Sequence, residues 1–139
     1  MFDIILAGGT VYDGSGESAY QADIAILGDR IAAIGDLAAA QAGERLDVSG
    51  YAVAPGFIDL HTHSDFTLLV NGKAESQVHQ GVTTEVIGQC GFSCAPVRHK
   101  ADIARLAIGY VAGREGEGWL SFAEYLERLE ETPLGINVA

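Results

Sequence analysis

The sequence is poor in basic residues and cysteine and has no long apolar run. Eight lysines and arginines stand against 19 aspartates and glutamates, and the formal net charge of −11 would repel phosphate backbones and anionic lipid surfaces. We therefore expect neither nucleic acid nor membrane partners. No stretch of 18 apolar residues and no basic segment leading into an apolar one is found, which favours a soluble, cytoplasmic protein.

Only Cys90 and Cys94 are present, too few for a disulfide scaffold in 139 residues. A reduced or metal-binding role for cysteine stays open. Hydrophobic residues make up 48% of the chain and charged residues 19%, so a packed core is expected rather than disorder. The 18 glycines lie mostly between short apolar runs, which predicts many short connections.

The first third of the chain predicts a small β-sheet domain. Residues 2–6, 22–27 and 30–34 are short runs rich in β-forming residues, each followed closely by glycine, and they are expected to form antiparallel strands. Residues 37–41 could form either a brief helical turn or a loop. We assign residues 1–54 to this domain.

Pro55-Gly56 marks the expected domain boundary, after which the pattern changes. Strands alternate with helices from there on, which indicates an α/β fold with parallel strands. The capping-box pattern Ser121-Phe122-Ala123-Glu124 predicts the start of a helix that Pro133 ends. The elements expected within residues 55–139 are strands at 57–63, 82–87 and 135–139 and helices at 73–80, 101–111 and from 121 onward.

A parallel sheet of three strands would leave an apolar edge without a partner. We therefore expect the chain to be an incomplete domain, cut short after about three strands. Self-association through the exposed edge is a second expectation.

His61 and His63 are two residues apart at the end of an expected strand. Alternate residues of a strand point to the same side, so both imidazoles could bind one metal ion. Asp59 and Asp65 share that side. The alternative is that the histidines are simply polar residues at a strand end.

Cys90 follows the β-branched run 82–87 and is flanked by glycine on one side. A thiolate at this strand end would suit zinc, whereas the alternative is a buried thiol with a packing role only. Two adjacent parallel strands that end in His-X-His and in cysteine would bring His61, His63 and Cys90 to one mouth of the sheet. This convergence favours a metal site.

Two segments carry a resemblance to a known family. Residues 55–65, Pro-Gly-Phe-Ile-Asp-Leu-His-Thr-His-Ser-Asp, resemble the first-strand signature of the amidohydrolase superfamily. Residues 80–93, which contain Cys90, are similar to the D-aminoacylases, or N-acyl-D-amino-acid deacylases. The resemblance implies the N-terminal part of a (β/α)8 TIM barrel, residues 55–139, with an attached small β-sandwich.

The resemblance also implies a set of roles. His61 and His63 would bind one zinc subsite, Cys90 would bind a neighbouring subsite, and Asp65 would orient a histidine. A full site holds one or two zinc ions, and its proton-shuttling aspartate is expected beyond residue 139. Gln89 stands where asparagine is expected more often.

The implied reaction converts an N-acyl-D-amino acid and water to a D-amino acid and a carboxylate, with this chain inactive by itself. Two alternatives stay open. One is a hydrolase of cyclic amides, like the hydantoinases and dihydroorotases. The other is a metal-binding remnant without enzyme activity that packs with another chain.

Other candidate residues are interpreted more simply. Cys94 could pair with Cys90 around zinc or in a disulfide, but a small loop residue is preferred. His79 and His99 are expected in solvent, and residues 115–118 in an exposed loop. A set of apolar residues near the last helix could line a pocket, but packing of the helix is favoured for Trp119, Phe122, Tyr125 and Leu126.

Overall fold

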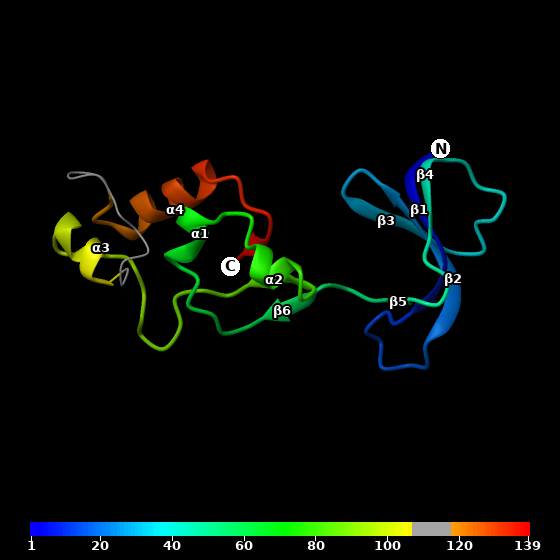
Figure 1. The fold of residues 1–139 in the computed structure, drawn as a ribbon, viewed down its shortest axis with the longest axis horizontal. Helices are drawn as coiled ribbons and strands as arrows, with labels where there is room; N and C mark the ends of the chain where they lie inside the picture. Colours follow the sequence, from blue (N-terminus) through cyan, green and yellow to red (C-terminus); the bar gives the residue numbers. More distant parts are fainter. Residues whose placement is uncertain (107–117) are drawn as a thin grey trace. The chain divides into compact units, whose positions relative to one another are not determined.

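The computed structural model describes residues 1–106 and 118–139 of the chain (Figure 1). The last part of the helix expected at 101–111 and most of the loop expected at 115–118 lie outside the described residues. The chain divides into two compact units, Met1–Pro55 and Gly56–Ala139. Each unit has its own sheet, so each is described by itself.

The first unit is a five-stranded mixed sheet. Its strands are β1 (Phe2–Val11), β2 (Tyr20–Leu27), β3 (Arg30–Gly35), β4 (Ala42–Asp47) and β5 (Ala52–Val53). The path runs β3-β2-β1-β4, and β5 also pairs with β1. The β1–β2 and β2–β3 pairs are antiparallel, as expected, whereas β4 and β5 run parallel to β1. Residues 37–41 are a loop closed by a turn, in which the Ala40 N–H donates to the Leu37 carbonyl at 2.9 Å.

Strand β1 extends five residues beyond the expected 2–6, because two glycines allow the strand to continue past a shift in its register with β2. Gly8 adopts φ +74, a conformation that L side chains rarely adopt, and the register with β2 shifts between Leu6 and Gly9. A Cβ on Gly9 would lie 2.6 Å from Val53 Cγ2, so only glycine permits this approach of β5. The strand therefore continues to Val11.

The second unit contains a three-stranded sheet of β6 (Phe57–Asp59), β7 (Val82–Glu85) and β8 (Asn137–Val138). The order is β6-β7-β8 and both pairs are parallel, which confirms the expected alternation of parallel strands and helices. Between them lie α1 (Thr67–Val70), α2 (Glu75–Val78), α3 (Lys100–Leu106) and α4 (Phe122–Glu131). Helix α1 was not expected, and α2 is shorter than the expected 73–80.

Helix α4 begins as the sequence predicts. The Glu124 N–H donates to Ser121 Oγ at 3.2 Å, and Glu124 Oε2 accepts from the Ser121 N–H at 2.9 Å. These two bonds form the predicted capping box. The Ser121 and Leu120 N–H groups both donate to Glu124 Oε2 and lower the pKa of this carboxyl. The helix ends at Glu131, just before Pro133.

The core of the second unit gathers around α4 and the segment after β7. Its most deeply buried apolar members include Leu68, Cys94 and Tyr125, which are 1%, 0% and 1% exposed. Trp119 and Tyr125 are buried, as expected for packing, whereas Phe122 and Leu126 are 51% and 42% exposed. Several apolar side chains of β6 and its continuation also face solvent: Phe57, Ile58 and Leu60.

The expected strand at 57–63 is wrong in its extent, because β6 ends at Asp59. The His61 N–H donates to Asp59 Oδ1 at 3.1 Å, so this backbone group bonds to a side chain and not to the backbone of a neighbouring strand. The strand expected at 82–87 likewise ends at Glu85. Within the part of the chain that the structure describes, no helix is long and apolar enough to cross a membrane.

Candidate metal centre

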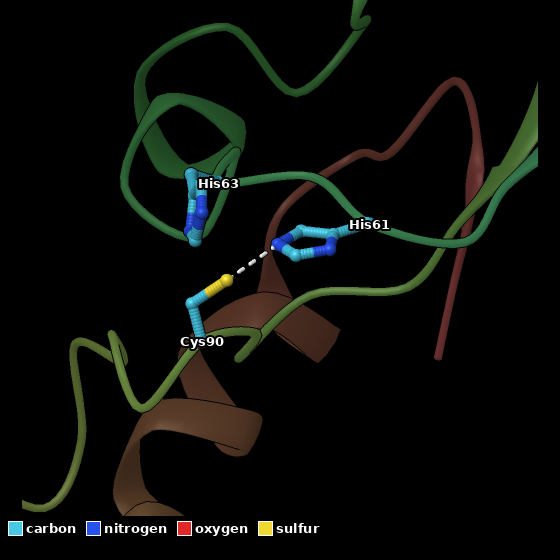
Figure 2. Close-up of side chains that lie close together, drawn as sticks. All are labelled: His61, His63 and Cys90. Atoms are coloured by element: carbon cyan, nitrogen blue, oxygen red, sulfur yellow. Dashed lines mark hydrogen bonds between the residues drawn. The ribbon is translucent and has the colours of Figure 1, made fainter.

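Three potential metal ligands converge beyond the ends of β6 and β7. His61 and His63 lie in the segment that follows β6, and Cys90 lies in the segment that follows β7. Their side-chain donor atoms lie within 4.8 Å of one another, and all three residues are exposed. Figure 2 shows the two imidazoles and the thiol turned toward one another. The predicted convergence of these residues is therefore present in the structure.

The closest contact in the cluster joins the two segments. Cys90 Sγ lies 2.8 Å from His61 Nε2, a hydrogen bond drawn as a dashed line in Figure 2. The rings of His61 and His63 meet edge to face, with centroids 5.4 Å apart, and Phe92 meets the ring of His63 in the same manner. The histidines are brought together by the turn after Asp59, not by the alternation of a strand.

Cys90 has an unusual backbone conformation. Its φ is +57, in the left-handed region, where a residue with a Cβ is disfavoured by roughly 1–2 kcal/mol. Gly88 and Gly91 on either side also have positive φ, +72 and +69. The loop therefore curls tightly around the cysteine. Strain at a residue that carries a reactive side chain is typical of functional sites.

Asp65 does not contact a histidine through any hydrogen bond found among the described residues. Its Oδ1 accepts from the Gly88 N–H at 3.1 Å, and its side chain is buried, with 1% exposure. The Tyr125 hydroxyl donates to the Asp65 carbonyl at 3.0 Å. No hydrogen bond among the described residues therefore supports the expected role of Asp65 in orienting a histidine. Its carboxylate is instead hydrogen-bonded to Gly88, in the loop that carries Cys90.

Sequence reasoning missed two polar residues beside the cluster. Ser64 and Glu85 are 4% and 0% exposed, and Ser64 Oγ donates to Glu85 Oε2 at 2.5 Å. The signal for Glu85 was a charged residue inside the β-branched run Val82–Ile87, where a buried strand predicts apolar residues. Ser64 carried no comparable signal, because serine after a histidine fits any exposed turn.

Cys94 lies apart from the ligand cluster. It is fully buried, and its carbonyl accepts a hydrogen bond from Trp119 Nε1 at 2.7 Å. Burial raises the pKa of the Cys94 thiol to about 12 and also raises the pKa of Tyr125. Both cysteines are free thiols, so the Cys90–Cys94 disulfide is not formed. Cys94 lies in the segment between β7 and α3, as expected for a loop residue, but its side chain is buried in the core of the second unit.

The remaining histidines lie where solvent reaches them. His79 and His99 are exposed, as expected, and neither joins the cluster of three donors. Gln89, next to Cys90, is half-buried.

The described architecture and the His-His-Cys cluster together define an α/β protein with donors of the kind that bind zinc. No family model matches the chain. Among curated proteins, it is 49% identical over 138 residues to a D-aminoacylase of Alcaligenes xylosoxydans xylosoxydans. That alignment covers 99% of this chain and 28% of the relative, so the chain spans less than a third of the relative's length.

Solved structures agree with this likeness. A D-aminoacylase with a binuclear metal centre matches with a TM-score of 0.86 and 44% identity, covering 100% of this chain and 29% of that one. The N-acyl-D-glutamate deacylase of Bordetella bronchiseptica, solved with zinc and a phosphonate inhibitor, matches with a TM-score of 0.80 and 37% identity over 99% and 28%. This chain is a relative of the D-aminoacylases and N-acyl-D-amino-acid deacylases and matches their N-terminal part.

Proposed function

We propose that His61, His63 and Cys90 bind zinc, and that these residues form the metal-binding part of a hydrolase that cleaves N-acyl-D-amino acids. The observation that carries the proposal is the approach of three donor atoms to within 4.8 Å of one another. The relatives add support, because they include D-aminoacylases and a deacylase solved with zinc. A (β/α)8 barrel with an attached β-sandwich is the architecture that we propose for the complete protein.

The donor set fits zinc. Imidazole nitrogen and thiolate sulfur are the ligands that zinc prefers, and pairs of ligands on one tetrahedral zinc lie roughly 3 to 4 Å apart. Cys90 Sγ and His61 Nε2 are already in direct contact at 2.8 Å, so binding would require only a small separation of the two side chains. A thiol that gives up its proton to become a ligand also makes binding dependent on pH.

The exposure of all three ligands favours a catalytic site over a closed structural site. Structural zinc is enclosed by four protein ligands, whereas catalytic zinc keeps a position open to water or substrate. Bound zinc would supply a water of lowered pKa and would polarise the amide carbonyl of the substrate. The part of His61, His63 and Cys90 in this chemistry is to hold the ion where solvent and substrate reach it.

The reaction also needs a group that gives a proton to the leaving amine. Among the described residues, neither nearby aspartate suits that role. Asp59 Oδ1 accepts from the His61 N–H, and Asp65 is buried. We therefore expect the 139 residues alone to bind zinc without hydrolysing N-acetyl-D-amino acids. Turnover by the purified, zinc-loaded chain that disappears in Cys90→Ala would contradict this expectation.

A chimeric enzyme tests the substrate class. The aligned 28% of the Alcaligenes D-aminoacylase would be replaced by this chain. We expect the chimera to hydrolyse N-acetyl-D-amino acids, to leave the L-enantiomers intact, and to lose activity in Cys90→Ala. A chimera that opens cyclic amides instead would favour a hydantoinase-like activity. One that folds and binds zinc without any hydrolysis would favour a metal-binding role alone.

A further inference from the structure

Two segments carry the proposed ligands, and the backbone hydrogen bonds found between them among the described residues lie near the strand ends. The Val86 N–H donates to the Asp59 carbonyl at 2.8 Å, and the Thr62 N–H donates to the Val86 carbonyl at 3.2 Å. The ladder between β6 and β7 therefore continues a short way past the strand ends. Cys90 lies four residues further along, in a loop with positive φ that this ladder does not reach.

Besides the contact between Cys90 and His61, two hydrogen bonds that involve side chains connect the segments, and their donors lie on opposite segments. Ser64 Oγ, next to His63, donates to Glu85 Oε2 at the end of β7. The Gly88 N–H, two residues before Cys90, donates to Asp65 Oδ1. We call the side chains of Ser64, Asp65 and Glu85 the carboxylate clasp. The segment after β6 thus provides a hydroxyl donor and a carboxylate acceptor. Strand β7 and the segment after it provide a carboxylate acceptor and a backbone N–H donor.

The carboxylate clasp is costly to bury. Asp65 and Glu85 are 1% and 0% exposed, and each has one oxygen, Asp65 Oδ2 and Glu85 Oε1, without a hydrogen-bond partner among the described residues. Replacing buried polar side chains with apolar ones of similar volume often leaves a protein equally or more stable, because a buried polar group loses its hydration. Stability alone therefore does not explain these residues. A buried polar group that is incompletely satisfied calls for a specific role.

We propose that Ser64, Asp65 and Glu85 are positioning residues that hold the Cys90 loop against the segment of His61 and His63. Without the clasp, the left-handed conformation of Cys90 would relax, and the thiol would leave its place beside His61 Nε2. The proposal rests on the metal site proposed above. Partners behind metal ligands commonly alter metal affinity by 10- to 100-fold, which sets the expected size of the effect.

Cobalt binding tests the clasp, because a thiolate ligand gives Co²⁺ a charge-transfer absorption that reports on Cys90. Ser64→Ala removes the donor to Glu85 and is expected to weaken Co²⁺ binding by about 10-fold. Ser93→Ala is the matched control. Ser93 lies in the Cys90 loop, but the hydrogen bonds of its hydroxyl to other described residues are local and go to the Ala95 backbone, so its loss should leave Co²⁺ affinity unchanged. Equal weakening by both substitutions would overturn the proposal.

Asp65 provides a rescue experiment. Asp65→Ala removes the acceptor of the Gly88 N–H and should weaken Co²⁺ binding, whereas Asp65→Asn keeps a carbonyl acceptor and should restore most of the affinity. If Asp65→Ala fails to fold, the comparison of Asp65→Asn with the Ser64 and Ser93 variants still decides the question. If these residues had a purely structural role, the variants would be less stable, but their Co²⁺ affinity, measured from the charge-transfer absorption, would be unchanged.

Amide hydrogen exchange in the metal-free chain separates this proposal from the metal site. The Gly88 amide is expected to be protected, to exchange at least about tenfold faster in Asp65→Ala, and to return toward the original rate in Asp65→Asn. An unchanged exchange rate in Asp65→Ala would show that the clasp does not hold the loop. The exchange changes could also be found in a chain that does not bind Co²⁺. That result would contradict the proposed metal site, but it would still support the claim that the carboxylate clasp holds the Cys90 loop.

Discussion

Cys90 and Cys94 are four residues apart and occupy opposite environments. Cys90 is exposed, strained at φ +57, and 2.8 Å from an imidazole nitrogen. Cys94 is fully buried among apolar side chains, next to the indole of Trp119. The loop after β7 exposes the thiol of Cys90 to solvent, and four residues later the chain is buried in the core.

The difference between the two cysteines shows that spacing alone is a poor guide to ligands. A Cys-X3-Cys pair suits zinc by its spacing, yet only one of these thiols faces other donors. A metal ligand must be a thiolate, and burial of Cys94 raises the pKa of its thiol to about 12. Exposure and neighbouring imidazoles, not sequence distance, separate the proposed ligand from the packing residue.

The largest expected difference is in reactivity toward an alkylating reagent. In the native metal-free protein we expect iodoacetamide to modify Cys90 at least about 100-fold faster than Cys94, because Cys94 reacts only after local opening of the core. Peptide mass mapping over time measures both rates. In denaturant the two cysteines should react at similar rates. Similar rates in the native protein would remove the distinction between them.

Matched serine substitutions should separate the two positions in stability. Cys94→Ser replaces a fully buried thiol with a more strongly hydrated hydroxyl and is expected to lower the free energy of unfolding by about 2 kcal/mol. Cys90→Ser at the exposed site should change it by less than about 0.5 kcal/mol. Urea denaturation of both variants gives the comparison. A larger loss at Cys90 would place that residue in the core instead.

Alkaline pH should destabilise the protein through Cys94. The pKa of this thiol is raised from 9.0 to about 12 in the folded chain, so between these values the unfolded chain has lost a proton that the folded chain keeps. Stability should therefore fall as pH rises, by up to about 1.4 kcal/mol per unit. Cys94→Ala should reduce the slope and leave the part due to Tyr125, whose pKa is also raised by burial. If stability depended on pH equally steeply in Cys94→Ala, the alkaline loss of stability would not be due to Cys94.

The smallest expected effect concerns backbone strain at Cys90. Glycine tolerates φ +57, so Cys90→Gly should be more stable than Cys90→Ala by roughly 1 kcal/mol in thermal or urea unfolding. Cys94 has no positive φ, and there the order should reverse, with Cys94→Gly less stable than Cys94→Ala. The same order at both positions would mean that Cys90 is not strained.

Much of the fold was predictable from local patterns. Short runs of β-forming residues followed by glycine predicted β1, β2 and β3, and the Ser121–Glu124 capping box predicted the start of α4. Strand β4 was missed because its sequence, Ala-Gly-Glu-Arg-Leu-Asp, has little apolar alternation. Its conformation depends on parallel pairing with β1, a contact between distant parts of the chain that local propensity does not contain.

The three candidate ligands could be predicted from the sequence, but the hydrogen bonds that hold them in place could not. Parallel strands that end together predicted the meeting of His61, His63 and Cys90, although the turn at Asp59 brings the histidines together in another way. The clasp between Ser64 and Glu85 joins residues 21 positions apart, and it could not be derived without the register of β6 and β7. Ligand types follow from chemistry, whereas their supporting bonds follow from tertiary packing.

The central claim is that His61, His63 and Cys90 form one metal site from which Cys94 is excluded. Titration of the metal-free chain with Co²⁺, followed by thiolate-to-cobalt charge-transfer absorption, tests it most directly. We expect the band in the unaltered chain and in Cys94→Ala, and its loss in Cys90→Ala with weakened binding in His61→Ala. A band that survives Cys90→Ala, or that is lost in Cys94→Ala while that variant remains folded, would contradict the claim.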